Sequence, residues 1–340
     1  MHKLKIFADP TSAAHNGGAG HPERPARLTA CLEAIDAVGI EVTTGSGPAS
    51  GEQLARVHEA SYLGRLERFC ARGGGSIDAD TYACPESFGI AARASGAVCL
   101  AVAEALLGRQ RSFCLPRPPG HHATADAAMG FCLLNHAAVG AAEALNLGAR
   151  KVAIVDYDVH HGNGTQDIFW ADPRVLYVSI HQYPWYPGTG ALEDTGGGEG
   201  EGTTVNVPLP SGTSEDVYFA AMQRIVVPAL GRFSPDLIIV SAGFDAHEAD
   251  PLAEMLLTAE SFEVMTSMLV LASNELCSGR LVLTLEGGYD LPALAESAMA
   301  ALTALSGEGG GARAYLEDAP PRSLEALRRA IDFHEGAATR

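Results

Sequence analysis

The stretch Val152-Ala-Ile-Val-Asp156-Tyr-Asp158-Val-His160-His161 joins a run of apolar residues directly to a cluster of polar ones. Short apolar runs rich in Val, Ile and Leu predict strands that are buried on both faces, as in a parallel sheet. Residues 237–241 lead to Asp245 in the same way, and residues 281–285 lead to Glu286-Gly-Gly-Tyr289. Because ligands of such sheets bind beyond the carboxyl ends of the strands, these polar residues are expected to meet in one site.

Helical patterns alternate with the strand patterns along the chain. Strands are expected at about residues 3–8, 112–115, 152–156, 175–180, 237–241 and 281–285. Helices are expected at 86–107 and 133–147, each followed by a glycine, and at 214–230, at 258–277 and from residue 292 onward. This alternation predicts an α/β fold of three layers, in which helices flank a largely parallel central sheet.

The length of 340 residues and the hydrophobic content of 47% allow one large core. A glycine-rich segment at 307–311 separates the last part of the chain from the rest. We therefore predict a main domain over residues 1–312 and a tail over residues 313–340 that packs on it, with a helix at about 323–333.

Charge and composition exclude several classes of protein. The net charge of −18 argues against a nucleic-acid partner, which would need a basic surface. The charge would suit a cationic substrate such as a polyamine or a lysine-rich peptide, although solubility explains most of it. We see no signal-peptide core and no segment with the length and apolarity of a membrane span, so a cytoplasmic location without a membrane partner is expected. Seven cysteines without a C-x-x-C pair predict reduced, buried thiols.

Three of the polar residues have the chemistry of a metal site. Asp158 and His160 are two apart, so in an extended segment their side chains point to the same side. Asp245, after another strand, can complete a set of three ligands. Three protein ligands and an open position are typical of a catalytic zinc site, although nitrogen and oxygen ligands also suit Fe(II), Co(II) or Mn(II).

The pair His121-His122 follows a rigid Pro118-Pro-Gly segment. Two imidazoles could supply the base that takes a proton from water and the acid that protonates a leaving amine. Each needs a partner to orient it, and Asp156 and Asn163 are the candidates. A carboxylate raises a histidine pKa more than an amide does, so the two imidazoles could titrate apart. The Tyr289 hydroxyl can donate to a developing oxyanion.

These motifs together resemble the zinc-dependent histone deacetylase family, whose fold is the arginase–deacetylase α/β domain. They occur in the family's order between about residues 15 and 300. His21-Pro-Glu-Arg-Pro25 and Asn163 resemble its class II branch, which includes bacterial deacetylase-like amidohydrolases. The motifs that carry the resemblance are Pro118-Pro-Gly-His-His-Ala123, Asp156-Tyr-Asp-Val-His-His-Gly-Asn-Gly164, Val178-Ser-Ile-His181, Pro187-Gly-Thr-Gly190, Ser241-Ala-Gly-Phe-Asp245 and Glu286-Gly-Gly-Tyr289.

The resemblance implies a role for each matching residue. One zinc ion would be bound by Asp158, His160 and Asp245. His122, steered by Asn163, would be the general base and also the acid, and His121 would be an electrostatic partner paired with Asp156. Tyr289 would polarise the acetyl carbonyl together with the zinc.

The resemblance also implies a tunnel for the acylated amine. Phe131 and Tyr186 would form its walls, Gly130 and Gly288 would line it, and Leu252 would lie at its rim. Arg24 would lie deeper, where acetate leaves.

Structural potassium is a further implication of the family. One potassium site would use backbone oxygens of Asp156, Asp158 and His160 together with Ser179 and Ile180. A second would use Phe169, Asp172 and Val175. His181 is expected to be structural.

Several alternatives stay open at this point. Leu252 favours acetyl-lysine in peptides or proteins as substrate, whereas an acetylpolyamine would favour the carboxylates of Asp78, Asp80, Glu248 and Glu254. A catalytically silent binding protein on the same fold is a more distant reading, because no key residue is missing. Asp245-Ala-His247 resembles manganese arginases, but His161 stands where a further acidic ligand would be needed. A homo-oligomer is possible on this sequence.

Overall fold

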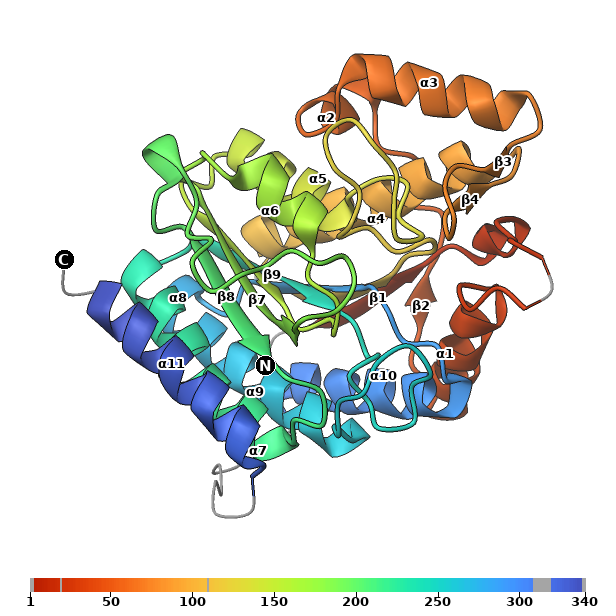
Figure 1. The fold of residues 1–340 in the computed structure, drawn as a ribbon. Helices are drawn as coiled ribbons and strands as arrows, with labels where there is room; N and C mark the ends of the chain where they lie inside the picture. Colours follow the sequence, from red (N-terminus) through yellow and green to blue (C-terminus); the bar gives the residue numbers. More distant parts are fainter. Residues whose placement is uncertain (1–2, 19, 109, 308–318, 338–340) are drawn as a thin grey trace.

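The fold is given by a computed structural model that describes residues 3–18, 20–108, 110–307 and 319–337 (Figure 1). Its centre is an eight-stranded sheet in the order β2-β1-β5-β10-β9-β6-β7-β8, and every neighbouring pair of strands is parallel. The strands are β1 (Leu4–Ala8), β2 (Val42–Thr43), β5 (Arg111–Leu115), β6 (Val152–Asp156), β7 (Val175–Gln182), β8 (Thr204–Leu209), β9 (Leu237–Ala242) and β10 (Leu281–Leu285). A separate antiparallel pair joins β3 (Gly75–Ser76) to β4 (Tyr82–Ala83).

Helices cover both faces of this sheet (Figure 1). Alternate residues of a strand enter two hydrophobic clusters: in β6, Val152 and Ile154 belong to one cluster and Ala153 and Val155 to the other. The first cluster packs against α2 (Gly51–Ala55), α3 (Ala60–Ala71), α4 (Ser87–Gly108), α5 (His136–Asn146) and α6 (Asn163–Phe169). The second packs against α1 (Ala26–Ala37), α7 (Glu215–Ala221), α8 (Val227–Phe233), α9 (Ala259–Cys277), α10 (Leu291–Ser306) and α11 (Pro321–Ala337). The predicted three-layer α/β fold is therefore confirmed.

Some elements differ from the prediction. The expected helix over 214–230 is divided into α7, a π-helical turn at Met222–Val226, and α8, which has a proline in its first turn. Gly108 was expected to follow the helix predicted at 86–107, but it is the last residue of that helix, α4. Strands β2 and β8 and helices α1, α2, α3 and α6 had no counterpart in the prediction.

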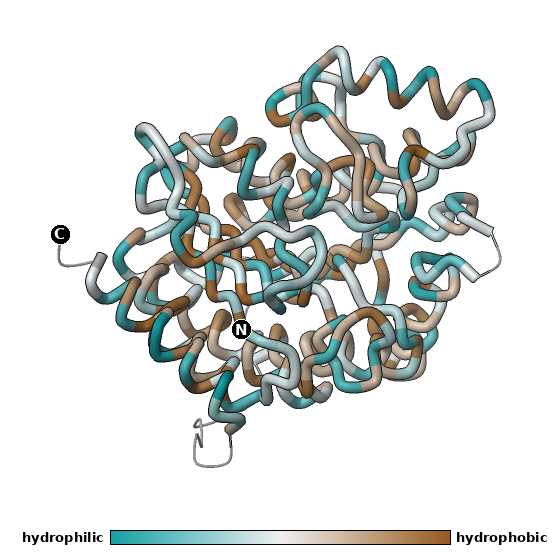
Figure 2. Tube along the Cα trace, in the orientation of Figure 1, coloured by the Kyte–Doolittle hydropathy of each residue, from teal (hydrophilic) through white to brown (hydrophobic). Residues whose placement is uncertain are grey.

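Helix α4 corrects the expectation that no segment is long and apolar enough for a membrane span. By length and composition alone α4 could cross a membrane, and 61% of its most apolar window is buried inside the molecule. It packs against α5 and the sheet, as the core helix of an α/β domain does. Figure 2 shows hydrophobic residues concentrated along the central strands that this helix helps to cover.

The tail of the chain forms α11, which is longer than the helix expected at 323–333. Its buried residues recur at helical spacing and face β8 and α7: Ser323, Leu327, Ala330 and His334. The predicted boundary between residues 312 and 313 lies outside the described residues.

Candidate active site

The candidate site lies at the carboxyl ends of four adjacent strands, β5, β10, β9 and β6. Each strand is followed by a segment with polar side chains: His121-His122 after β5, Glu286-Gly-Gly-Tyr289 after β10, Asp245 after β9, and Asp156 to His160 at the end of β6. Parallel strands place their carboxyl ends at one edge of the sheet, so residues that are far apart in sequence meet there.

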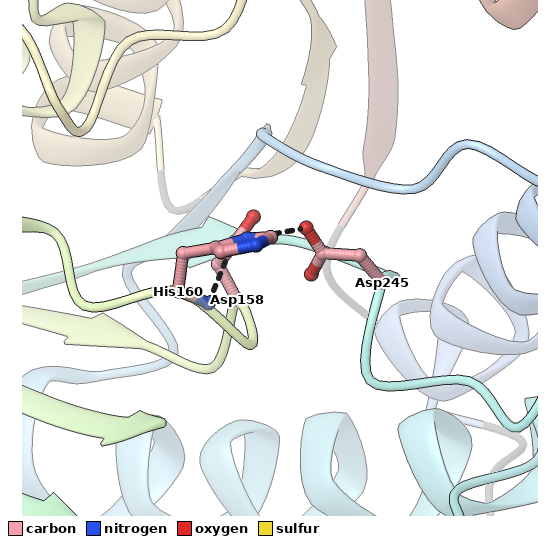
Figure 3. Close-up of side chains that lie close together, drawn as sticks. All are labelled: Asp158, His160 and Asp245. Atoms are coloured by element: carbon pink, nitrogen blue, oxygen red, sulfur yellow. Dashed lines mark hydrogen bonds and ion pairs between the residues drawn. The ribbon is translucent and has the colours of Figure 1, made fainter. Parts of the chain in front are cut away.

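Asp158, His160 and Asp245 form one buried group of possible metal ligands (Figure 3). One ligand atom from each lies within 4.8 Å of the others, and His160 Nδ1 is 3.2 Å from Asp158 Oδ1 and 3.1 Å from Asp245 Oδ2. Backbone N–H groups hold both carboxylates: Gly287 N donates to Asp158 Oδ2 at 2.7 Å, and Val159 N donates to Asp245 Oδ1 at 2.9 Å.

This group fits a divalent cation in two respects. Two buried carboxylates beside an imidazole have the charge and the oxygen and nitrogen donors that such an ion needs. Glycines surround the group so closely that a Cβ on Gly287 would lie 1.9 Å from Asp245 Oδ2, and one on Gly243 would lie 2.0 Å from Asp158 Oδ2. The backbone thus packs tightly around carboxylates that are held in one position.

The two adjacent histidines lie beside this group, and each has the partner expected from the sequence. His121 Nδ1 donates to Asp156 Oδ2 at 3.0 Å, and His122 Nδ1 donates to Asn163 Oδ1 at 2.8 Å. Tyr177 also donates to Asp156 Oδ2, at 3.1 Å. Asp156 and Asn163 thus each bind Nδ1 of one histidine and leave its Nε2 for other contacts. In His121, Nε2 lies 3.8 Å from Asp158 Oδ1.

The two imidazoles are expected to differ in charge at neutral pH. Burial opposes a charge on His121, but the carboxylates of Asp158 and Asp156 outweigh it and raise its pKa to about 10. Burial lowers the pKa of His122 well below its ordinary value, and the nearby His121 and His160 lower it further. A charged His121 therefore lies beside a neutral His122 that can accept a proton.

Tyr289 closes the other side of the site. Its ring lies 5.7 Å from the Phe131 ring, and burial raises the pKa of its hydroxyl well above 10, so it is a neutral donor. Beneath the ring lies Arg27, whose guanidinium carbon is 4.8 Å from the ring centre and whose Nε donates to Gly288 O at 2.6 Å.

The arginine near the base of the site is Arg27, which corrects the expectation for Arg24. Arg24 is exposed, whereas Arg27 is completely buried. Both belong to the segment that enters α1, and Arg27 is in the first turn of that helix, on the side that faces the core. Arg27 is buried because of the face of α1 on which it lies, and the motif around Arg24 does not indicate this.

A cavity of about 270 Å³ leads to this group from the surface. The tunnel residues expected from the sequence line it, with the exception of Gly288, and Asp80 and Trp185 join them. Its lining is Asp80, His122, Gly130, Phe131, His160, Trp185, Tyr186, Leu252 and Tyr289.

The backbone is constrained where the cavity wall meets the catalytic pair. Phe131 has φ of 68°, an uncommon value for a residue with a side chain, and its N–H donates to Thr81 Oγ1 at 3.1 Å. A Cβ on the preceding Gly130 would lie 2.4 Å from the His122 ring. Glycine is therefore needed at 130 to bring this wall against His122.

Sequence reasoning missed Asp250 and Trp185, and it assigned no contacts to Glu286 of the expected Glu286-Gly-Gly-Tyr289 segment. Asp250 accepts from the N–H groups of Tyr289 and Leu252, at 2.6 and 3.0 Å, and so ties the two loops together. Glu286 accepts from the N–H groups of Gly120 and His121, at 2.6 and 3.0 Å. Trp185 Nε1 donates to Leu252 O at 2.9 Å. The Asp-Pro pair at 250–251 was a turn signal that could have indicated the first.

The residues expected at potassium sites lie in two places. Ser179, on β7, pairs with Asp156, and its hydroxyl lies 2.9 Å from His181 Nδ1. Phe169, Asp172 and Val175 form a short turn, in which the Asp172 side chain is paired with Arg174. His181 Nε2 donates to Gly190 O at 2.9 Å, which is a structural contact, as expected.

The histone deacetylase domain matches this chain over residues 21–305. The chain belongs to the histone deacetylase family. A histone deacetylase-like amidohydrolase of Pseudomonas aeruginosa is 42% identical over 317 residues, which cover 92% of this chain and 82% of that protein. A probable deacetylase of Archaeoglobus fulgidus is 40% identical over 82% of this chain and 79% of its own length.

Solved histone deacetylase structures agree with this membership. The crystal structure of the HDA15 HD domain superposes with a TM-score of 0.91 at 36% identity, and the match covers 99% of this chain and 96% of that one. The chain is therefore a hydrolase of the deacetylase type with the arginase–deacetylase fold. Histone deacetylases act on acetylated substrates, and the family suggests a metal ion, for which the Asp158–His160–Asp245 group is a possible site.

Proposed function

We propose that this deacetylase is zinc-dependent and removes acetyl groups from the ε-amino group of lysine in peptides or proteins. The observation that carries the proposal is the cavity: aromatic rings of Phe131 and Tyr186 and the apolar Leu252 line it, and it reaches His160 of the buried acid–histidine group. Such walls suit the four-carbon stem of an acyl-lysine and exclude water from the reacting amide.

Asp158, His160 and Asp245 would hold the zinc ion, which when bound supplies Lewis-acid activation of the amide carbonyl and of water. The other steps belong to the residues around it. Neutral His122, oriented by Asn163, takes a proton from the attacking water and returns a proton to the leaving amine. The hydroxyl of Tyr289 donates to the carbonyl oxygen as its negative charge develops.

Charged His121 has an electrostatic role in this scheme. It lies between Asp156 and Asp158, whose negative charges it offsets, and its ring centre is 4.0 Å from that of His122. A positive charge there disfavours protonation of the resting His122, which is therefore ready to act as a base.

The alternative substrate is an acetylpolyamine, whose distant ammonium would need a carboxylate near the rim. Of the four carboxylates considered from the sequence, Asp80 lines the cavity, whereas Asp78, Glu248 and Glu254 are exposed outside it. Leu252, for which we propose a position at the rim, carries no charge, and this favours acyl-lysine. The catalytically silent alternative has no feature of the site in its favour.

Hydrolysis of a fluorogenic acetyl-lysine peptide, compared with N-acetylputrescine and N8-acetylspermidine, tests the proposal. We expect zinc-dependent turnover of the peptide with a kcat/KM that exceeds the values for both polyamines. Preference for the polyamines would reject acetyl-lysine and would assign the ammonium to Asp80. Absence of all turnover in the zinc-loaded protein would favour the silent binding protein.

We also propose that potassium is a structural ion in this chain, as the family resemblance implies. Asp156, Asp158 and His160 would offer backbone oxygens beside Ser179 and Ile180, all of which are buried. A thermal unfolding midpoint that rises with potassium and not with an equal concentration of a larger organic cation would support this.

A further inference from the structure

Helix α11 lies outside the segment that matches the family domain. The match ends at residue 305, whereas α11 spans Pro321–Ala337. Two buried hydrogen bonds hold this helix on the core: Ser323 Oγ lies 2.9 Å from Thr213 Oγ1, and His334 Nε2 donates to the backbone oxygen of Asn206 at 2.9 Å. Asn206 is on β8, the edge strand of the sheet.

From Asn206 a chain of hydrogen bonds continues toward the active site. Asn206 Nδ2 donates to Gln166 Oε1 at 2.8 Å, and His161 Nε2 donates to the same oxygen at 3.0 Å. Because Nε2 carries the proton of a neutral imidazole, Nδ1 is an acceptor, and it accepts from Thr189 Oγ1 at 2.7 Å. The partners of His161 thus fix both its tautomer and its orientation.

The inner end of this chain reaches functional parts of the site. His161 follows the metal ligand His160 directly, and Thr189 lies three residues after the tunnel wall Tyr186. Tyr186 and Trp185 are 38% and 37% exposed, so little of the core covers this part of the wall.

The wall loop packs tightly at one point. A Cβ on Gly190 would lie 2.5 Å from the His181 ring and 2.6 Å from the His161 ring, and the φ of 85° at Gly190 also requires glycine. Residues 189–190 are therefore where the exposed wall is attached to the interior, by His161 through Thr189 and by His181, whose Nε2 donates to Gly190 O at 2.9 Å.

We propose that His334, Asn206, Gln166 and His161 are positioning residues, which fix the tunnel wall at Tyr186 by linking α11 to Thr189. The functional unit of this chain then extends beyond the matched family domain to α11. The inference rests on the tunnel of the proposed function, but it holds for any acylated amine that the tunnel takes.

Matched variants at the two ends of the chain test this. His334→Leu removes the donor, whereas His334→Gln keeps one. Thr189→Val removes the hydroxyl, whereas Thr189→Ser keeps it. Ser323→Ala is a control that weakens the docking of α11 without touching the chain, and Arg329→Ala is a control that removes an exposed ion pair with Glu193.

The measurements are KM, kcat, metal content and the thermal midpoint, with the best acetylated substrate of the wild-type protein. We expect His334→Leu and Thr189→Val each to raise KM by about threefold to tenfold, the factor for the loss of one hydrogen bond, with kcat and metal content little changed. His334→Gln and Thr189→Ser should restore KM. The double variant His334→Leu/Thr189→Val should raise KM less than the product of the two single effects, because both break one chain.

Two results would overturn the proposal. One is an unchanged KM in Thr189→Val, which is on an exposed loop and tests the chain even if His334→Leu does not fold. The other is an equal increase in KM for Ser323→Ala and His334→Leu when the two variants lower the thermal midpoint by the same amount. In that case α11 would affect the tunnel only through the stability of the protein. Failure of the wild-type protein to hydrolyse acetyl-lysine would reject the proposed substrate but not this inference.

Discussion

Gly287→Ala should destroy the metal site without replacing any of its proposed ligands. The new Cβ would lie 1.9 Å from Asp245 Oδ2 and 2.6 Å from Asp158 Oδ2, whereas real Cβ contacts are essentially never under 3.0 Å. Asp245 Oδ2 or the backbone must therefore move by at least 1.1 Å, the difference between 3.0 and 1.9 Å. Metal ligands tolerate displacements of only about 0.2 Å.

A displacement of about 1 Å at a reacting centre costs on the order of 100-fold in rate, and loss of the ion would cost more. We therefore expect kcat/KM to fall by at least about 100-fold and the bound metal to decrease. The assays are turnover of the best acetylated substrate and metal analysis of the purified protein. Gly231→Ala is the control, because its Cβ would meet nothing within 4 Å. Wild-type metal content and activity in Gly287→Ala would refute this account of the packing.

Three further predictions concern the hydroxyl, the rim and a buried histidine. Tyr289→Phe should keep the contacts of the ring with Phe131 and Arg27, and with them the thermal midpoint. Because the hydroxyl is lost, kcat should fall by about 100- to 1000-fold in a steady-state assay. Full activity would exclude the hydroxyl as donor. Leu252→Glu should raise kcat/KM for N8-acetylspermidine relative to the acetyl-lysine peptide, because it places a carboxylate at the cavity mouth; an unchanged ratio would mean that this residue does not contact the substrate. His136 is fully buried, and burial lowers its pKa from 6.5 to about 4, so the unfolded state binds the proton first as the pH falls. Its contribution to stability is present above pH 6.5 and decreases toward pH 4, by roughly 3 kcal/mol. In urea unfolding across this range, His136→Gln should lose less free energy of unfolding than the wild-type protein. Equal losses in the two proteins would contradict the prediction.

The sequence was most informative where an apolar run ends at a polar cluster. Residues 152–160 predicted both a buried strand and the ligands after it, because the burial of a central parallel strand requires continuous apolar residues. The four strands that supply the site are neighbours in the sheet, which sequence order does not reveal, since β5 and β10 are adjacent but about 170 residues apart.

For the features that the sequence did not predict, the local sequence signal is ambiguous and only the position in the fold decides it. Strand β8 contains Pro208, which counts against a strand in the sequence but is tolerated because β8 is at the edge of the sheet. Arg24 belongs to the His21–Pro25 motif and Arg27 follows it by two residues, and only the start of α1 at Ala26 determines which one is buried. The Asp250-Pro251 pair signals a turn, but it does not show that Asp250 accepts from the N–H of Tyr289 in a distant loop.

The most direct test of the account is a metal titration of the apoprotein. Zinc is removed with a chelator, and one equivalent is then added back to the wild-type protein and to Asp245→Asn while deacetylation of an acetyl-lysine peptide is followed. We expect no activity without metal, full recovery at one equivalent for the wild-type protein, and no recovery for Asp245→Asn. Turnover by the metal-free protein, or equal recovery by Asp245→Asn, would contradict the assignment of Asp158, His160 and Asp245 as the catalytic metal site.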